Sequence, residues 1–300
     1  MLEFTLPSQS SSLKHCQTAK VPAPDGAELA HYYWQGVPGK PVVAYFHGIE
    51  GHSQWFADTA YFLNQHGLSV YAFDRRGSGL NSADRGHARS ADQLLADVEG
   101  AIDFVEKSHP GAPLFVLGNC WGAKCAILAA KRLCSVQSGE HLSGLILTAP
   151  AIKTIVNLPL ATKIDIFFAW LFRSPKLFPI PITPEMFTKN PVWLDYIYSD
   201  PFRLTQATGS FFVSSTILSF LSQQAPAKLT CPTLVLQAVN DQIVDWQYVK
   251  SWFDAVASSD KSFICFPDSD HSLDFSTSVQ KYWDCLYEWI CRHAVSRKAI

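Results

Sequence analysis

Residues 114–128, LFVLGNCWGAKCAIL, contain the transition that decides the fold. The stretch begins with apolar residues typical of a buried strand and ends in AKCAIL, which is typical of a helix. Between them, Gly118 and Gly122 flank Cys120, as a tight turn requires. The pattern G-x-C-x-G is weak alone, but a strand before it and a helix after it predict that Cys120 projects from the end of a sheet strand.

Short apolar runs recur on both sides of this stretch. They are nearly continuous, which is typical of strands covered on both faces. The runs lie at residues 41–47, 68–74, 113–118, 144–150, 232–241 and 261–267. Apolar residues at helical spacing separate them, as after Ser90, where Gln93 completes a capping box. This alternation predicts an α/β fold with a mostly parallel central sheet flanked by helices.

Two segments depart from the alternation. Residues 14–34 predict two strands around the turn Asp25-Gly26. Residues 151–225 are rich in aromatic residues and prolines and lack strand signals of sheet length. We therefore predict a core formed by residues 1–150 and 226–300, interrupted by a helical lid insertion at 151–225.

Composition excludes several classes of protein. The net charge of −2 and the scattered basic residues do not favour a nucleic-acid partner. The amino end lacks the pattern of a secretory signal, which predicts a cytoplasmic protein. The apolar run IDIFFAWLF at 164–172 is far shorter than the roughly 20 residues of a transmembrane helix, although it leaves open a transient contact with a membrane surface.

The cysteines predict neither a disulfide framework nor a metal centre. The chain has eight cysteines, with no CxxC pair and no Cys/His cluster at zinc spacing. We expect most of them to be reduced residues of the core. No metal and no cofactor is expected.

Cys120 has the surroundings of a nucleophile. The turn places it at a helix amino terminus, where the dipole and free N–H groups favour a thiolate. His271 follows the run 261–267 and is the predicted base, and Asp241 at the end of the run 232–241 is the predicted acid. Both would lie at the same edge of the sheet as Cys120.

Other residues compete for these roles. His47 and His52 are alternative bases, but His47 ends a buried strand and His52 follows the loop after it. Alternative acids are Asp245, Asp268 and Asp270. The order of nucleophile, acid and histidine along the chain is that of α/β-hydrolases. His47-Gly48 ends another strand, so the amides of Ile49 and Trp121 are the predicted oxyanion hole.

With these residues, the sequence resembles the α/β-hydrolase superfamily. Within it, the sequence resembles the monoacylglycerol lipase and lysophospholipase branch, which is of the serine aminopeptidase S33 type. The resemblance runs from about residue 25 to 294. Its motifs are HGIEGHS (47–53), DRRGSGLNS (74–82), the turn around Cys120, NPVWLDYIYSDP (190–201), KLTCPTLVLQAVNDQIVD (228–245) and the His271 loop. The resemblance implies that the insertion is a lid over an acyl-binding tunnel. It also implies substrate-binding roles for the lid residues Phe167, Phe168, Trp170, Leu171 and Phe172.

The nucleophile departs from that family, which carries serine where this chain has Cys120. A thiolate leaves more easily than an alkoxide, so a cysteine favours thioesters or activated esters as acyl donors. We therefore predict an acyl hydrolase, an esterase or thioesterase, that acts through a Cys-His-Asp triad and an acyl-cysteine intermediate. Its substrate would be a small-molecule ester or thioester with a medium or long apolar acyl group, including one bound to CoA or a carrier protein. An acyltransferase with the same intermediate and a non-catalytic ligand-binding homologue are the alternatives.

Overall fold

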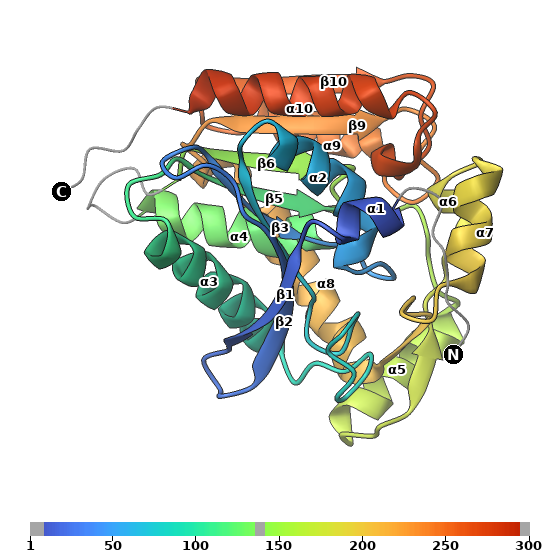
Figure 1. Ribbon diagram of the computed structural model, residues 1–300. Helices are drawn as coiled ribbons and strands as arrows, with labels where there is room; N and C mark the ends of the chain where they lie inside the picture. The colour runs from blue at the N-terminus through green and yellow to red at the C-terminus, as the bar shows by residue number, and fades with distance from the viewer. Residues whose placement is uncertain (1–8, 136–141, 295–300) are drawn as a thin grey trace.

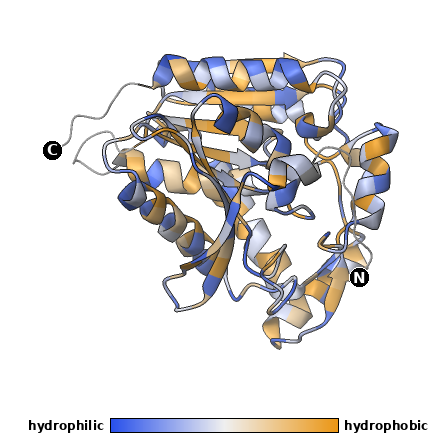
Figure 2. Ribbon diagram, viewed as in Figure 1, coloured by the Kyte–Doolittle hydropathy of each residue, from blue (hydrophilic) through white to orange (hydrophobic). Residues whose placement is uncertain are grey.

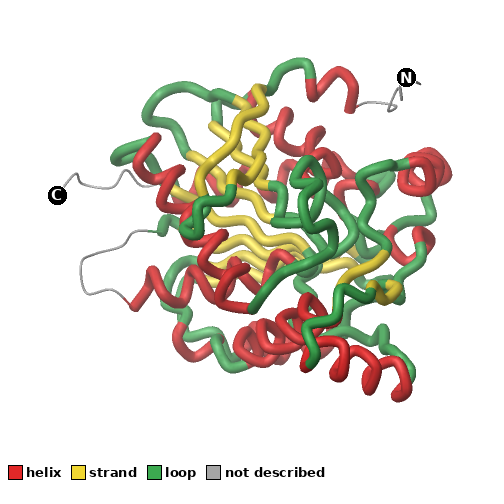
Figure 3. The backbone as a smooth tube through the Cα atoms, turned by 90° about the horizontal axis from the view of Figure 1, so that it is seen from below, coloured by secondary structure: helices red, strands yellow, loops and turns green. Residues whose placement is uncertain are grey.

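One twisted sheet organises the protein. The computed structural model describes residues 9–135 and 142–294. Within them, one sheet has eight strands in the order β1-β2-β4-β3-β5-β6-β9-β10 (Figures 1 and 3). Its strands are β1 (Gln17–Pro22), β2 (Glu28–Trp34), β3 (Val42–Phe46), β4 (Ser69–Phe73), β5 (Leu114–Asn119), β6 (Gly144–Thr148), β9 (Thr233–Ala238) and β10 (Lys261–Phe266).

The sheet is parallel from β4 to β10 and antiparallel at the β1-β2 edge. The strands β3, β4 and β6 are buried along their whole length, and β5 is buried up to its last residue. Their continuous apolar sequences have this cause, because helices cover both faces. The predicted parallel core and the predicted hairpin in residues 14–34 are both confirmed.

Helices cover the sheet in two layers. Apolar residues of α2 (Ala57–Gln65) and α10 (Val279–His293) pack on one face. Those of α3 (Ala91–Ser108), α4 (Gly122–Ser135) and α9 (Trp246–Asp254) pack on the other. Shorter elements are α1 (Gln9–Leu13) and the 3₁₀ turns Ser53–Phe56, Pro226–Lys228 and Leu273–Phe275.

The predicted cap of α3 is present in a modified form. The Gln93 N–H donates to the Ser90 hydroxyl oxygen at 3.1 Å, as a capping box requires. The side-chain oxygen of Gln93, however, accepts from the N–H of Arg89 and not from that of Ser90. The reciprocal bond therefore reaches one residue farther back than the sequence pattern predicts.

The segment at 151–225 is helical, with one short pair of strands. Its elements are α5 (Leu160–Leu171), β7 (Leu177–Pro179), α6 (Pro184–Phe187), α7 (Pro191–Ser199), β8 (Gln206–Thr208) and α8 (Gly209–Gln223). Phe211 and Leu218 of α8 belong to the same apolar cluster as α3 and α4. Thus α8 anchors the segment on the core, whereas α5 lies at its outer end (Figure 1). The division into core and lid domains stays a prediction.

The cysteines are free, and they differ in burial. Only Cys120, Cys125 and Cys231 are buried, whereas Cys265 and Cys291 are exposed. Cys265 lies on β10, an edge strand with a single sheet neighbour, so its side chain reaches solvent. Three more are partly buried against the apolar clusters: Cys16, Cys134 and Cys285. Most cysteines therefore pack in or against the core as predicted, and Cys265 and Cys291 are the exceptions.

Candidate active site

Cys120 lies in a strained turn between β5 and α4. Its φ is +50°, in the left-handed region that residues other than glycine rarely adopt. A Cβ on Gly118 would lie 2.6 Å from the Cα of Ala123. One on Gly122 would lie 2.3 Å from the carbonyl oxygen of Phe46. The two glycines are therefore required by close packing, and the strain is held by the surrounding structure.

The backbone of Cys120 is tied to the neighbouring strand. Its N–H donates to the Thr148 carbonyl at 2.9 Å, and its carbonyl accepts from the N–H of Ala151 at 2.9 Å. The Cys120 side chain is only 2% exposed, yet it contributes to the walls of two cavities. The turn thus presents the thiol to enclosed space at the carboxyl end of the sheet.

His271 and Asp241 meet beside Cys120. The Nδ1–H of His271 donates to Oδ2 of Asp241 at 2.8 Å. The other carboxylate oxygen of Asp241 accepts from the N–H groups of Ile243 at 2.8 Å and Val244 at 2.9 Å. His271 and Cys120 line the same small cavity. The acid is therefore fixed by the backbone, and it in turn fixes the imidazole.

The structure corrects the predicted position of Asp241 at a strand end. β9 stops at Ala238, and Asp241 lies in the following loop. The N–H of Asn240 donates to the carbonyl of Ser269, so the chain has left the strand and turned toward the loop of His271. This turn is what brings the carboxylate to the imidazole.

The competing acids have other partners. Asp245 caps α9 by accepting from the N–H of Tyr248 at 3.0 Å. Asp270 accepts from the N–H of Lys189 at 2.8 Å. Neither these two residues nor Asp268 bonds to His271, whose acidic partner within the described residues is Asp241.

The charge of His271 is set by its two neighbours. Burial opposes the protonated imidazole, but the Asp241 carboxylate and the Cys120 sulfur outweigh it and raise the pKa of His271 to about 10. On the side away from Asp241, the Nε2 atom is buried and makes no other hydrogen bond to the described residues. This nitrogen is therefore free for proton exchange with Cys120 or a ligand.

The competing histidines hold structure. Nε2 of His47 accepts from the N–H of Arg75 at 2.9 Å, and its Nδ1–H donates to the Gly48 carbonyl at 2.8 Å. Burial, reinforced by the Arg75 charge, keeps the pKa of His47 well below 6.5, so its ring is neutral. His52 bonds through Nε2 to Asp200 at 2.9 Å. Neither ring is free to serve Cys120.

Two backbone N–H groups beside Cys120 are unpaired. Within the described residues, the N–H of Ile49 and that of Trp121 donate no hydrogen bond. Both residues line the same cavity as the thiol. Buried N–H groups are rarely left without an acceptor. Their arrangement suits an oxygen atom that becomes negatively charged next to Cys120.

Arg75 holds the loop that carries the Ile49 amide. Its guanidinium donates to the carbonyls of Gly48 at 3.0 Å and Ile49 at 2.8 Å. It also lies over the ring of Trp121, 4.7 Å from the centroid. Burial lowers the pKa of Arg75 to about 10, which leaves it charged at neutral pH. Because both carbonyls point at the guanidinium, the loop amides are turned the other way.

A second set of contacts ties this loop to the insertion. Asp200 accepts from Trp55 Nε1 at 2.7 Å in addition to His52. Glu50 accepts from Arg203 Nε at 2.7 Å, and its carbonyl accepts from the Leu204 N–H at 2.8 Å. These partners lie about 150 positions apart in sequence, so the pairs could not be predicted from the sequence. The motifs HGIEGHS and YSDP were the available signal.

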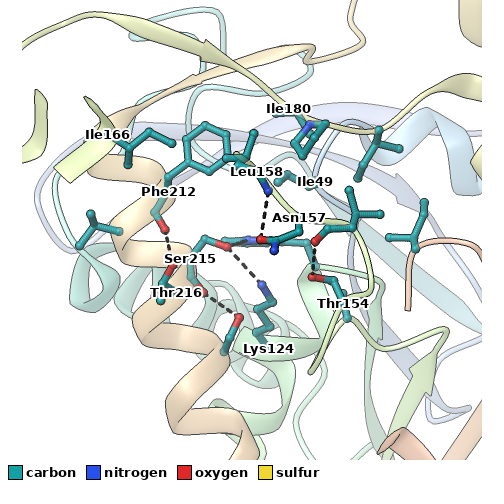
Figure 4. Close-up of a pocket in the computed structure, with 18 of the residues that line it drawn as sticks. Ile49, Lys124, Thr154, Asn157, Leu158, Ile166, Ile180, Phe212, Ser215 and Thr216 are labelled. Atoms are coloured by element: carbon teal, nitrogen blue, oxygen red, sulfur yellow. Dashed lines mark hydrogen bonds between the residues drawn. The ribbon is translucent and has the colours of Figure 1, made fainter. Parts of the chain in front are cut away.

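The larger of the two cavities that Cys120 lines has a volume of about 570 Å³. The insertion supplies most of its wall, and Figure 4 shows Ile166, Ile180 and Phe212 around it. Polar side chains of Lys124, Ser215 and other residues interrupt the apolar lining. The sequence did not predict Lys124 as a cavity residue, because a lysine inside a helix after the turn is usually a surface residue.

Only one of the five predicted lid residues lines this cavity. Phe167 does so, as do Lys163 and Ile166 on the same side of α5. The others lie outside the lining and are at least 40% exposed: Phe168, Trp170, Leu171 and Phe172. An apolar helix that is hydrophobic on two sides cannot present all its aromatic residues to one cavity. Figure 2 shows the hydrophobic character of α5 at the edge of the molecule.

Two further features bear on the range of functions. No helix in residues 9–135 and 142–294 is long and apolar enough to cross a membrane. The same residues contain no group of three or more His, Cys, Asp or Glu side chains that could hold a metal ion.

Known proteins are similar to this chain in sequence. A family model described as "Serine aminopeptidase, S33" matches residues 38–276. Monoglyceride lipase of Homo sapiens is 28% identical over 255 residues, which cover 83% of this chain and 81% of that protein. Phospholipase YtpA of Bacillus subtilis is 26% identical over 240 residues, covering 77% of this chain and 87% of that protein.

A solved structure agrees in shape along nearly the whole chain. A soluble variant of monoglyceride lipase from Saccharomyces cerevisiae superposes with a TM-score of 0.77 at 19% identity, covering 99% of this chain and 98% of that one. At this identity the likeness shows the fold alone. It confirms the predicted fold class, and the family match and the relatives confirm the predicted enzyme class. The chain belongs to the serine aminopeptidase S33 family of α/β-hydrolases and is a carboxylic ester hydrolase of that type.

Proposed function

We propose that the protein hydrolyses an apolar acyl ester or thioester through an acyl-cysteine intermediate on Cys120. The observation that carries the proposal is the convergence on one thiol of a strained turn, an unpaired His271 nitrogen and two unpaired amides. A merely structural cysteine needs none of these. Cys125, five positions farther on in α4, has none of these features, and burial raises its pKa to about 12.

The first half of the reaction forms the acyl-enzyme. With the proton on Nε2 of His271, the Cys120 sulfur attacks the carbonyl carbon and the carbonyl electron pair moves onto oxygen. The amides of Ile49 and Trp121 stabilise that oxyanion. When the C=O bond re-forms, the bond to the leaving group breaks, and His271 gives its proton to the departing oxygen or sulfur. Asp241 keeps the imidazole oriented and stabilises its cation.

The second half releases the acid. His271 now takes a proton from water at Nε2, and the water oxygen attacks the acyl carbon. The tetrahedral adduct collapses with cleavage of the C–S bond, which regenerates the thiolate beside the imidazolium. Every proton in this cycle passes through the nitrogen that the structure leaves without another partner.

Leaving-group chemistry narrows the donor. A tetrahedral adduct between a thiolate and an ordinary ester collapses backward more easily than forward, because sulfur leaves before alkoxide. A thioester removes this handicap. The apolar lining of the cavity supports an acyl chain as its occupant, and the relatives named for lipase and phospholipase activity support an acyl ester as the substrate class. A thioester on CoA or a carrier protein is the finer part of the proposal.

The exposed side of α5 supports a transient contact with a lipid surface. Its apolar residues are Leu160, Ile164, Phe168, Leu171 and Phe172. They recur at helical spacing and are too short a span to cross a bilayer. A cytoplasmic enzyme with this helix could take acyl donors from a membrane.

The experiment compares octanoyl thioester with the matched octanoyl alkyl ester on the wild type, Cys120→Ser and Cys120→Ala. We expect the wild type to prefer the thioester, Cys120→Ser to shift the preference toward the oxygen ester, and Cys120→Ala to lose about 10³-fold or more in kcat on both. Turnover retained by Cys120→Ala would refute the nucleophile. Product that forms only with an added amine or alcohol would identify a transferase, and binding without turnover would identify a carrier.

A further inference from the structure

Lys124 is a buried cation in the wall of the proposed substrate cavity. It lies on α4, four positions after Cys120, and lines the same cavity as the thiol. The residue is only 5% exposed. A lysine at this depth usually extends its amine to water or pairs it with a carboxylate. Within the described residues, no carboxylate pairs with Lys124, and its amine faces the cavity.

Among residues 9–135 and 142–294, the amine of Lys124 has one hydrogen-bond partner. Its Nζ donates to the hydroxyl oxygen of Ser215 at 3.1 Å, as Figure 4 shows. That oxygen also accepts from Trp121 Nε1 at 2.8 Å. An ammonium group has three N–H donors, so two remain for a ligand. Ser215 retains its own hydroxyl proton as a further donor.

No carboxylate of the described residues compensates the charge of Lys124: the Cys120 and Cys125 sulfurs favour the charged amine, and Arg75 opposes it. Arg75 is a second buried cation, and both amine and guanidinium lie over Trp121, with Nζ 5.9 Å from the ring centroid. Burial lowers the pKa of Lys124 to about 8, so the amine is mostly charged at neutral pH. A buried ammonium group without a carboxylate partner is costly, and a bound anion would offset that cost.

The rest of the cavity gives this anion its context. The lining also includes the polar side chains of Asn157, Thr154, Thr216 and Ser219. Figure 4 shows the apolar side chains of Ile166, Ile180 and Phe212 on the side of the cavity opposite Lys124. A neutral acyl chain would cover the amine without satisfying it. A chain or head group that carries a negative charge would fill the apolar part and pair with Lys124.

We propose that Lys124 and Ser215 form an anion-binding subsite, which accepts a carboxylate or phosphate group carried by the acyl substrate away from its reacting carbonyl. This proposal rests on the proposed function in so far as the cavity is the substrate site. The charged group can belong to the far end of the acyl chain, as in the half-ester of a dicarboxylic acid. It can also belong to the head group, as in a lysophosphatidate.

Matched substrate pairs test the subsite by selectivity. One pair is the p-nitrophenyl half-ester of suberic acid against p-nitrophenyl octanoate, and the other is lysophosphatidate against the monoacylglycerol of the same chain. We expect the wild type to favour the anionic member of one pair in kcat/KM, and the pair identifies the source of the charge. In Lys124→Met that preference should fall by about 10- to 100-fold, as expected for a charged hydrogen bond in a buried site.

Two controls keep this readout specific. Lys176→Met removes a lysine from the surface of the segment 151–225, which lines the cavity, and should keep the wild-type preference. Ser215→Ala should reduce the preference in the same direction as Lys124→Met, which guards against a Lys124 variant that folds poorly. If Lys124 instead supports the thiolate, both members of each pair slow equally and the preference is unchanged. That result would overturn the subsite.

A binding measurement separates the subsite from the catalytic proposal. Free suberate and octyl phosphate should raise the midpoint temperature of unfolding of the wild type more than octanol does, and this difference should vanish in Lys124→Met. If no ester or thioester is turned over but this difference is present, the proposed function fails and the subsite stands. If neither anion stabilises the wild type more than octanol does, the subsite is refuted.

Discussion

The residues around Cys120 and the helix α5, which we call the roof of the cavity, are held in place in different ways. Around Cys120, the polar side chains are tied to the backbone, as in the bonds of Asp241 to two amides and of Arg75 to two carbonyls. On α5, only Ile166 and Ala169 are buried, and the cluster that holds them is small. The contrast indicates that the reacting groups are rigid. Side chains of α5, in contrast, can be replaced without affecting them.

The largest effect is expected from Asp241→Asn. Loss of the carboxylate removes the charge that stabilises the imidazolium and the acceptor that orients the ring, so kcat should fall by about 10³- to 10⁴-fold. Asp245→Asn is the matched control, because Asp245 caps α9 and asparagine is an equally good cap. Steady-state kinetics measure both variants. Equal activities would remove Asp241 from the site.

The same variant sharpens the electrostatic account. The pKa of His271 is raised from 6.5 to about 10 on folding, so its contribution to stability is complete below pH 6.5 and is lost as pH rises through about 10. We expect the unfolding free energy of the wild type to decline over this interval. The decline should be much smaller in Asp241→Asn, as urea titrations at several pH values can measure. A decline of the same size in both proteins would contradict the assignment.

An intermediate effect is expected from Arg75→Lys. Lysine keeps the charge but cannot donate in a fork to the carbonyls of Gly48 and Ile49. The variant should lose about 2–3 kcal/mol of unfolding free energy and roughly 10- to 100-fold in kcat, because the Ile49 amide is no longer held.

Arg76→Lys tests whether position or charge matters. Arg76 donates to both carboxylate oxygens of the buried Asp97 and to Asp25, so its replacement should cost about 1–3 kcal/mol of unfolding free energy but leave kcat close to the wild type. A wild-type kcat for Arg75→Lys would mean that the loop amides need no such support.

The smallest effect on stability is expected on the roof. Replacing both Phe168 and Phe172 by serine should change the unfolding free energy by no more than about 0.5 kcal/mol per residue, because both are largely exposed. Binding to phosphatidylcholine vesicles should nevertheless fall several-fold in a sedimentation assay. Vesicle binding equal to that of the wild type would show that α5 does not contact lipid.

The same contrast explains what could be predicted from the sequence. The turn around Cys120 was predictable because close backbone packing leaves only glycine at positions 118 and 122. Asp241 and His271 were predictable because parallel strands bring their carboxyl ends to one edge. The loop partners Asp200 and Arg203 come from the distant insertion, and only the fold brings them to His52 and Glu50.

The roof was harder to predict for a different reason. Helix α5 is apolar on more than one side, so helical spacing could not decide which aromatic residues face the cavity. Phe167 faces it and Phe168 does not. Lys124 was missed because composition and spacing do not reveal burial of a charged side chain inside a helix. A partner that neutralises such a charge can lie outside the chain.

The most direct test of the central claim is to trap the acyl-enzyme and map the modified residue. Protein mixed with an octanoyl thioester is quenched in acid within one turnover, digested and analysed by peptide mass spectrometry. Cys265 is an internal control, because it is exposed and would react first if labelling were only chemical. We predict an octanoyl group on Cys120 that forms and decays at the rate of turnover. Turnover with no acyl group on Cys120, or with label on Cys265 alone, would contradict the account.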